Sequence, residues 1–163
     1  MTVDSQTFRQ TLGSFATGVT IVTTQDPVSK KPVGVTVSAF SSVSLDPPLV
    51  LFCLGKHSAS HLAFNTNGHF AVNFLAEDQA DLSNRFASKL EDKFEGIEYT
   101  QGIGNVPVLS SSIAHLECTM NKVFDGGDHH IFVGLVEAAG FKPASKPLLY
   151  YRGSYAAISG DVK

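Results

Sequence analysis

One histidine of this chain follows an acidic glycine turn and has the chemistry expected of a functional residue. His129 follows Gly126, Gly127 and Asp128 and leads into an apolar run. The carboxylate of such a turn commonly bonds its own backbone, and it can hold a neighbouring imidazole in one tautomer. His129 is therefore a candidate functional residue, although taken alone the pattern more often belongs to a structural histidine.

Small and hydroxyl side chains gather on one face of a candidate strand at residues 34–40. Side chains alternate across a strand, so one face suits a core and carries Val35, Val37 and Ala39. The other face carries small or hydroxyl groups and then a ring, namely Gly34, Thr36, Ser38 and Phe40. A flat polar ligand can lie there, because little bulk blocks the backbone. The alternative is a Ser/Thr-rich strand with one solvated face. A proline pair at 47–48 ends the element.

The loop at residues 53–58 has the composition of an anion site. It reads Cys53, Leu54, Gly55, Lys56, His57 and Ser58. Ser58 can cap the helix expected next, whose free N–H groups attract phosphate, and Lys56 adds a full charge. Lys89 and Lys93 are further candidates for the same anion. A plain helix cap with solvated lysines is the alternative.

Two histidines, His57 and His61, lie four residues apart at the start of that helix. The spacing is compatible with a metal, but no acidic or third ligand accompanies the pair. We therefore expect surface or capping histidines, and we predict no metal site.

Asn73 is a polar residue on an otherwise apolar strand at residues 69–75. Phe70, Val72 and Phe74 face one side of this strand, so Asn73 faces the other. A polar residue there needs a partner. That partner is either a ligand or the chain's own backbone.

The chain lacks the common nucleotide and nucleophile motifs. The nearest match to G-x-G-x-x-G, at Gly102 and Gly104, has no third glycine and precedes Pro107 rather than a helix. There is also no P-loop lysine and no G-x-S-x-G elbow. Any NAD(P)H must therefore bind outside a Rossmann fold.

Hydrophobic periodicity predicts an all-antiparallel barrel with short inserted helices. The expected strands span residues 18–24, 33–40, 49–54, 69–75, 112–124, 129–141, 147–151 and 154–158. Helices are expected near residues 4–12, 59–65 and 77–86, the first packing on the strands next to it in sequence, with little regular structure at 89–107. Six or more strands in hairpins favour an antiparallel barrel over alternating βα units.

Length and composition narrow the class of protein. The 163 residues, 43% hydrophobic and 17% charged, predict one domain, residues 1–163, with a sizeable core. Twelve Phe and no Trp make Phe the expected large core residue. A net charge of -3 without a basic cluster argues against nucleic acid and membrane partners. The polar N-terminus, the lack of any apolar span and two isolated cysteines indicate a soluble cytoplasmic protein.

The order and spacing of these segments resemble the flavin reductase family, the small reductases that feed two-component flavin monooxygenases. The run at 34–50 resembles the family signature, and 126–134 is similar to its G-D-H turn followed by an apolar strand. Residues 82–87 resemble its L-S-x-x-F-A element, and 150–155 its closing Y-x-G-x-Y element. The likeness covers nearly the whole chain.

The resemblance implies a mainly β fold, a Greek-key split β-barrel that binds flavin and forms a homodimer. It implies that the isoalloxazine lies on Thr36, Val37, Ser38, Ala39 and Phe40. The ribityl phosphate side would lie along Cys53, Leu54, Lys56 and Ser58, with Lys93, and Asn73, Phe86 and Ala87 would border the flavin. The nicotinamide nucleotide would meet His129, the catalytic candidate, and Arg152, Gly153 and Tyr155. Without the resemblance, 82–87 is an ordinary amphipathic helix and 150–155 a hairpin with surface tyrosines.

The activity implied by the resemblance is hydride transfer from NADH or NADPH to FMN or FAD, with the reduced flavin supplied to a partner monooxygenase. Such a transfer needs no strong protein acid or base, which accounts for the lack of a triad or carboxylate pair. The alternative is a split-barrel module that stores, shuttles or senses flavin without turnover. A third hypothesis, direct oxidation of a bound organic substrate, requires a deeper private pocket. The choice of flavin, of nicotinamide and of oxygenase stays open.

Overall fold

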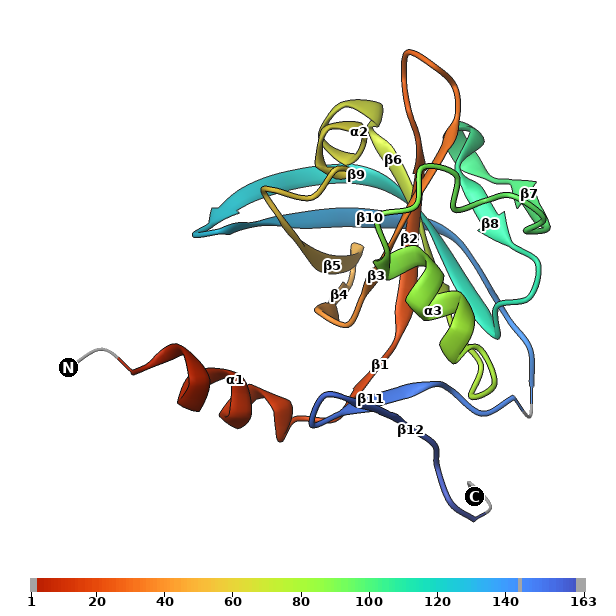
Figure 1. Cartoon of the computed structure of the whole chain (residues 1–163). Coiled ribbons are helices and arrows are strands. Elements are labelled where there is room, and N and C mark those ends of the chain that lie inside the picture. The colour runs from red at the N-terminus through yellow and green to blue at the C-terminus, as the bar shows by residue number, and fades with distance from the viewer. Residues whose placement is uncertain (1–2, 144, 161–163) are drawn as a thin grey trace.

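A seven-stranded antiparallel sheet forms the centre of the computed structural model, which describes residues 3–143 and 145–160 (Figure 1). In sheet order its strands are β3 (Pro32–Val37), β2 (Thr20–Gln25), β6 (His69–Phe74), β9 (Ala114–Gly126), β10 (His129–Phe141), β5 (Pro48–Gly55) and β4 (Phe40–Leu45). The long β9–β10 hairpin turns at residues 127–128, as the Gly-Gly-Asp sequence predicts. Strands β3, β4, β5 and β6 of this sheet carry six of the residues predicted to contact the flavin, namely Thr36, Val37, Phe40, Cys53, Leu54 and Asn73.

The sheet curls because its two edge strands are neighbours in sequence. β3 ends at Val37 and β4 begins at Phe40, yet they lie at opposite ends of the strand order. Two residues cannot cross seven strands spaced about 4.8 Å apart, so the edges must approach each other. Within the described residues β3 contacts β5, but no ladder closes the gap. The predicted split barrel is therefore confirmed.

Phenylalanine rings fill the barrel. Phe52 stacks on Phe132 with ring centroids 4.9 Å apart and meets Phe70 edge-on at 5.0 Å. All three rings are fully buried, and Phe64 of α2 (His61–Asn67) joins them. The prediction that Phe dominates the core is confirmed. A full burial of such rings contributes roughly 1.5–3 kcal/mol each.

The remaining elements surround the barrel. A second sheet joins β1 (Thr17–Gly18), β11 (Leu149–Tyr151) and β12 (Ser154–Ala156), and a third pairs β7 (Tyr99–Gln101) with β8 (Pro107–Leu109). The helix α3 (Ala80–Ala87) packs on β3, and a short 3-10 turn, η1, spans Ile103–Asn105. No helix of the described residues is long and apolar enough to cross a membrane. The segment 89–107 is thus more regular than predicted, because β7 finds a partner in β8.

The N-terminal helix α1 (Ser5–Gly13) stands apart from the barrel (Figure 1). Asp4 caps it as predicted, accepting from the backbone N–H groups of Gln6 and Thr7 at 3.0 and 2.9 Å. The prediction that this helix packs on the adjoining strands is wrong. None of its residues is buried, and its apolar side chains Phe8 and Leu12 are 51% and 56% exposed.

The strand predicted at 33–40 is interrupted. β3 ends at Val37, Ser38 and Ala39 are exposed, and Phe40 starts β4. Val37 is buried as expected, but the assignment of Ala39 to the core is wrong, because the chain turns there from one edge of the sheet to the other. Residues 38–39 are consequently exposed at the surface.

Candidate functional site

A cavity of about 740 Å³ opens between β3, the loop before α2 and the end of α3. We call it the β3–α3 cavity. Its wall includes four residues predicted to bind flavin: Ser58, Phe86, Ala87 and Lys93. Gly34 and Lys89 line it as well. Residues distant in sequence therefore meet where the resemblance implies a flavin.

Lys93 places a cation in the wall of this cavity. Its Nζ donates to the carbonyl of Phe86 at 2.7 Å and lies 3.5 Å from that of Gly34. Burial lowers the pKa of Lys93, because water solvates the ammonium group less fully. The ammonium is thus positioned by the backbone.

The donors in this cavity suit a phosphate group. Lys89 lines the same wall, and the Ser58 oxygen accepts from the Ser60 N–H at 3.3 Å, which leaves its hydroxyl hydrogen to donate. Two ammonium groups and a hydroxyl can bind one phosphate or pyrophosphate. Asp26 and Glu91 also line the cavity, so its lysine side, and not its whole wall, fits an anion.

Phe86 acts as a wedge between α3 and β3. Its ring is fully buried, and a Cβ added at Gly34 would lie 2.5 Å from the Phe86 Cε1 atom. Gly34 is therefore required for helix packing, and its side of β3 is covered by the ring instead of open to a flat ligand. Ala87, at the end of α3, lines the cavity.

The residues predicted to hold the isoalloxazine divide between structural and open positions. Thr36 donates from Oγ1 to the carbonyl of Ser83 at 2.6 Å, and Phe40 packs edge-on against Phe74 at 5.3 Å. Val37 lies in the core. Ser38 and Ala39 are exposed at the split of the barrel, but their carbonyls accept from the N–H groups of Phe40 at 3.0 Å and Cys53 at 2.9 Å. The predicted continuous hydroxyl row does not form.

The side chains at the end of β5 and in the loop after it are mostly buried or paired within the chain. Leu54 is buried in the core, and burial raises the pKa of the half-buried Cys53 thiol, which keeps it protonated and unreactive. Lys56 pairs with Asp125 at 2.7 Å, and its N–H donates to the Asp128 carbonyl at 3.0 Å. Lys56 therefore braces the loop against the β9–β10 hairpin.

His129 lies at the start of β10, and Asp128 fixes the orientation of its ring. Its Nδ1 lies 2.7 Å from Asp128 Oδ1, and the His129 side chain is 48% exposed. A carboxylate only accepts, so Nδ1 carries the proton and Nε2 is the free nitrogen. The bond from His129 lowers the pKa of Asp128. Nε2 lies 3.8 Å from where a Cβ of Gly55 would be, so the loop passes close to the ring.

Asn73 is buried and satisfied by the chain itself. Its Nδ2 donates to the Ile21 carbonyl at 3.0 Å and to Thr23 Oγ1 at 3.1 Å, and its Oδ1 accepts from the Leu109 N–H at 2.8 Å. With a fully buried side chain it has no surface to offer a flavin. Of the two hypotheses for Asn73, the backbone-satisfied one matches this geometry.

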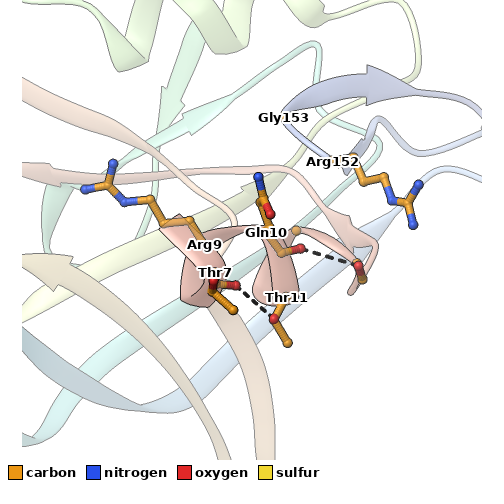
Figure 2. Close-up of a pocket in the computed structure, with 8 residues that line it drawn as sticks. Thr7, Arg9, Gln10, Thr11, Arg152 and Gly153 are labelled. Atoms are coloured by element: carbon orange, nitrogen blue, oxygen red, sulfur yellow. Dashed lines mark hydrogen bonds between the residues drawn. The ribbon is translucent and has the colours of Figure 1, made fainter. Parts of the chain in front are cut away.

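Arg152 and Gly153 form the turn between β11 and β12, beside α1. The φ angles there are 48° and 81°, in the left-handed region that suits glycine. The turn and one side of α1 line a second cavity of about 620 Å³, and Figure 2 shows the Arg9 and Arg152 side chains reaching in different directions from it. The Arg152 guanidinium lies 5.2 Å from the centre of the Tyr151 ring, a cation–π contact.

Tyr155 binds α3 instead of facing the Arg152 turn. Its hydroxyl lies 2.8 Å from Ser83 Oγ and 2.9 Å from Asn84 Oδ1. The Ser83 carbonyl also accepts the hydrogen bond from Thr36 Oγ1, so this serine joins β3, α3 and β12. Sequence reasoning missed Ser83 as a site residue; its place as a small residue within the L-S-x-x-F-A segment was the available signal.

The predicted site residues therefore fall into three groups. One lines the β3–α3 cavity, one lies at the start of β10 around His129, and one forms the β11–β12 turn. In Figure 1 the tip of the β9–β10 hairpin and the β11–β12 turn lie well apart. Among the described residues no backbone hydrogen bond joins Arg152 to His129.

Comparison with known proteins places these features in a family. Residues 12–159 match the family described as "Flavin reductase like domain". The chain is 46% identical over 162 residues to the reductase subunit HsaB of a flavin-dependent monooxygenase from Mycobacterium tuberculosis, covering 98% of this chain and 85% of that protein. It is 40% identical to the FMN reductase (NADH) SmoA of Agrobacterium fabrum, covering 96% and 87%.

A solved structure has the same architecture. The NADH:FAD oxidoreductase SgcE6 of Streptomyces globisporus, in complex with NAD and FAD fragments, superposes with a TM-score of 0.91 and 35% identity. The match covers 100% of this chain and 99% of that one.

Proposed function

We infer the function of this chain from one premise: it belongs to the flavin reductase-like domain family. It is an NAD(P)H-dependent flavin oxidoreductase that reduces FMN or FAD. A bound flavin accepts the hydride of the reduced nicotinamide, and the protein's part is to hold the two rings in register. The match over residues 12–159, which spans every strand of the split barrel, carries this proposal. We propose residues 1–163 as a single domain.

Reduced flavin supplied by this chain serves a partner monooxygenase. The M. tuberculosis relative is named as the reductase subunit of such an enzyme. The β3–α3 cavity supports a flavin that can leave, because the cavity is wide and lined in part by exposed loops. Two free cysteines without a disulfide agree with a cytoplasmic location, which we propose as well.

On the flavin side, the chain offers a phosphate site and the exposed residues Ser38 and Ala39. Ser58, Lys89 and Lys93 donate to the phosphate, and the exposed residues Ser38 and Ala39 offer their N–H groups to the ring. Their carbonyls already accept from the N–H groups of Phe40 and Cys53. We keep Thr36, Val37, Phe40, Cys53, Leu54, Phe86 and Ala87 as residues that shape this site. Lys56 acts by fixing the loop, because its charge is already paired with Asp125.

His129 is the residue that we propose for orienting the nicotinamide. Asp128 fixes its ring, and the free Nε2 can accept a hydrogen bond from the carboxamide of the nicotinamide. It transfers no proton in this role. It contributes by placing the hydride donor, an effect that depends on geometry alone.

A second copy of the chain completes the assembly. α1 exposes Phe8, Leu12 and, just beyond it, Phe15, which is 77% exposed. Exposed apolar side chains on and next to a helix that projects from its own barrel suit an interface. A homodimer would also bring α1 and the adjoining Arg152 turn of one copy to the other, where Arg152 and Gly153 can reach a dinucleotide phosphate.

The test is a matrix of spectrophotometric assays. Catalytic protein is mixed with NADH or NADPH and with FMN, FAD or riboflavin, and absorbance at the reduced-nicotinamide band is followed. Rapid oxidation with at least one pairing is expected and identifies both preferences. Flavin binding without oxidation in any pairing would contradict the reductase and favour a module that stores or senses flavin.

A further inference from the structure

Two histidines that the hydride transfer does not use make a short contact between α2 and β10. His61 Nε2 lies 2.7 Å from His130 Nδ1, and the ring centroids are 4.8 Å apart. At that distance one nitrogen donates and the other accepts. The bond therefore forms when neither ring or one ring is charged. It is lost when both are charged, because two N–H groups then face each other.

The surroundings of the pair oppose a second proton. The Phe132 ring lies 5.9 Å from His61 and 6.2 Å from His130 between centroids. Lys56 adds a positive charge. Asp125 faces His130 and is paired with Lys56 at 2.7 Å, and the bond and charge of Lys56, then the charge of His130, lower the pKa of Asp125. Burial, then the charges of His130 and Lys56, lower the pKa of His61. The bond is thus intact at neutral pH and is broken by acidification.

The other charged groups at this junction belong to the opposite face of β10. Asp128 binds His129, and the charges of His129 and His57 further lower the pKa of Asp128. Successive residues of a strand face opposite sides, so His129 and His130 diverge. Asp128 is therefore engaged with His129 and does not offset a second proton on His130.

The pair closes a loop that β10 already holds at its other end. In the β5–β10 ladder Gly55 is paired with His129, which fixes the start of the loop 55–60. The loop ends where α2 begins, at His61, which is bonded to His130. Two consecutive residues of β10 thus anchor both ends of the loop that carries Lys56 and Ser58.

We propose that the His61–His130 pair positions the loop 55–60 for flavin phosphate and releases it when both imidazoles are protonated, a role that rests on the proposed function. Flavin is then held at neutral pH and bound more weakly in acid. The pair is a positioning device and touches neither reacting ring. The variant His130→Asn separates the hydrogen bond of the pair from its protonation. The Asn amide nitrogen occupies the place of Nδ1, so it can form the bond, but it does not titrate.

The experiment measures the Kd for FAD by fluorescence from pH 7.5 to pH 5.5. FAD is chosen because a phosphate monoester such as that of FMN itself titrates near about pH 6. For the unchanged chain we expect the Kd to rise about three- to tenfold on acidification, the effect of one lost hydrogen bond. The variant His130→Asn should bind FAD as tightly as the unchanged chain at pH 7.5, and its Kd should not change with pH. The variant His130→Ala should bind FAD weakly at every pH. The control His115→Asn, a histidine change on β9 remote from the pair, should match the unchanged chain.

A second readout without flavin separates the two proposals. Amide hydrogen exchange of the loop 55–60, corrected for the intrinsic effect of pH, should rise in acid for the unchanged chain and not for His130→Asn. A pH-dependent loop in a chain that binds no flavin would contradict the proposed function alone. Equal pH dependence of FAD binding in the unchanged chain and in His130→Asn would overturn the role of the pair.

Discussion

His129 is the residue that we propose orients the nicotinamide. Asp128 orients its ring at 2.7 Å, and the loop at Gly55 passes beside Nε2. The sequence predicted the contact between Asp128 and His129 because turn chemistry is local and needs only adjacent residues. It did not identify the His61–His130 pair, because the two rings come from elements 69 positions apart. Such a contact depends on how the helix α2 packs against β10, which a single sequence does not specify.

Replacing His129 with Ala should lower turnover of NAD(P)H more than flavin affinity. Loss of the orienting nitrogen leaves the nicotinamide misplaced, and we expect kcat/KM for the nicotinamide to fall about tenfold to hundredfold. The Kd for flavin should change less than about threefold, because the phosphate site is separate. Steady-state kinetics beside a flavin titration measures both quantities, with His115→Ala as the control. Equal losses in the two would sink the assignment.

Gly34 should tolerate no side chain. A Cβ there would lie 2.5 and 2.7 Å from two atoms of the buried Phe86 ring, so Gly34→Ala should destabilise the fold by about 1–3 kcal/mol. Gly18→Ala is the matched control, because nothing lies within 4 Å of the Cβ that it would add. Urea unfolding of the two variants checks this. A similar midpoint for both would show that Phe86 moves away at no cost.

At the scale of elements, the sequence pattern predicted the helices and strands well where residues close in sequence specify them. The strand at 18–24, the helix capped by Asp4 and the hairpin at 112–141 were predicted to within a few residues, because β-branched runs, a cap and a glycine turn specify them. β4 was missed although Ser42, Val43, Ser44 and Leu45 alternate in polarity, because the predicted strand ran through residues 38–39 to Phe40 and the turn there was not anticipated. That edge strand gains its order from the ladder with β5, a tertiary effect.

Asn73 joins three strands, and its loss should be a loss of stability. Its amide bonds β6 to β2 and to β8, so Asn73→Ala leaves the Leu109 N–H and the Ile21 carbonyl short of partners. We expect the free energy of unfolding to fall by about 2–4 kcal/mol, measured by urea unfolding. The Kd for flavin, taken well below the transition, should be unchanged. A folded variant of normal stability with weak flavin binding would restore Asn73 to the flavin site.

At the scale of the whole molecule, α1 is the element whose apolar side chains do not pack against the rest of the chain. Its apolar side chains are exposed, as the sequence alone could not show, because helical spacing reveals an apolar face but not what covers it. The sequence-based expectation of a dimer came from resemblance alone. The projecting helix gives that proposal a physical basis.

The double change Phe8→Asp and Leu12→Asp should therefore convert a dimer into a monomer. Truncating an apolar anchor costs about 2 kcal/mol at an interface, so two changes should weaken dimerisation by about a hundredfold or more. Sedimentation velocity at micromolar concentration measures the outcome. Val28→Asp, a change at a residue 89% exposed in the β2–β3 turn, is the control and should remain dimeric. A double variant that stays dimeric would place the interface elsewhere.

The most direct test of the whole account is an anaerobic reduction with excess flavin. A trace of the chain is mixed with NADH or NADPH and a large molar excess of FMN or FAD, and flavin bleaching is followed without oxygen. We predict many equivalents of flavin reduced per chain, one for each nicotinamide oxidised, because the flavin enters and leaves the site. Reduction that stops at one equivalent per chain, or that never begins, would contradict a reductase that supplies free reduced flavin.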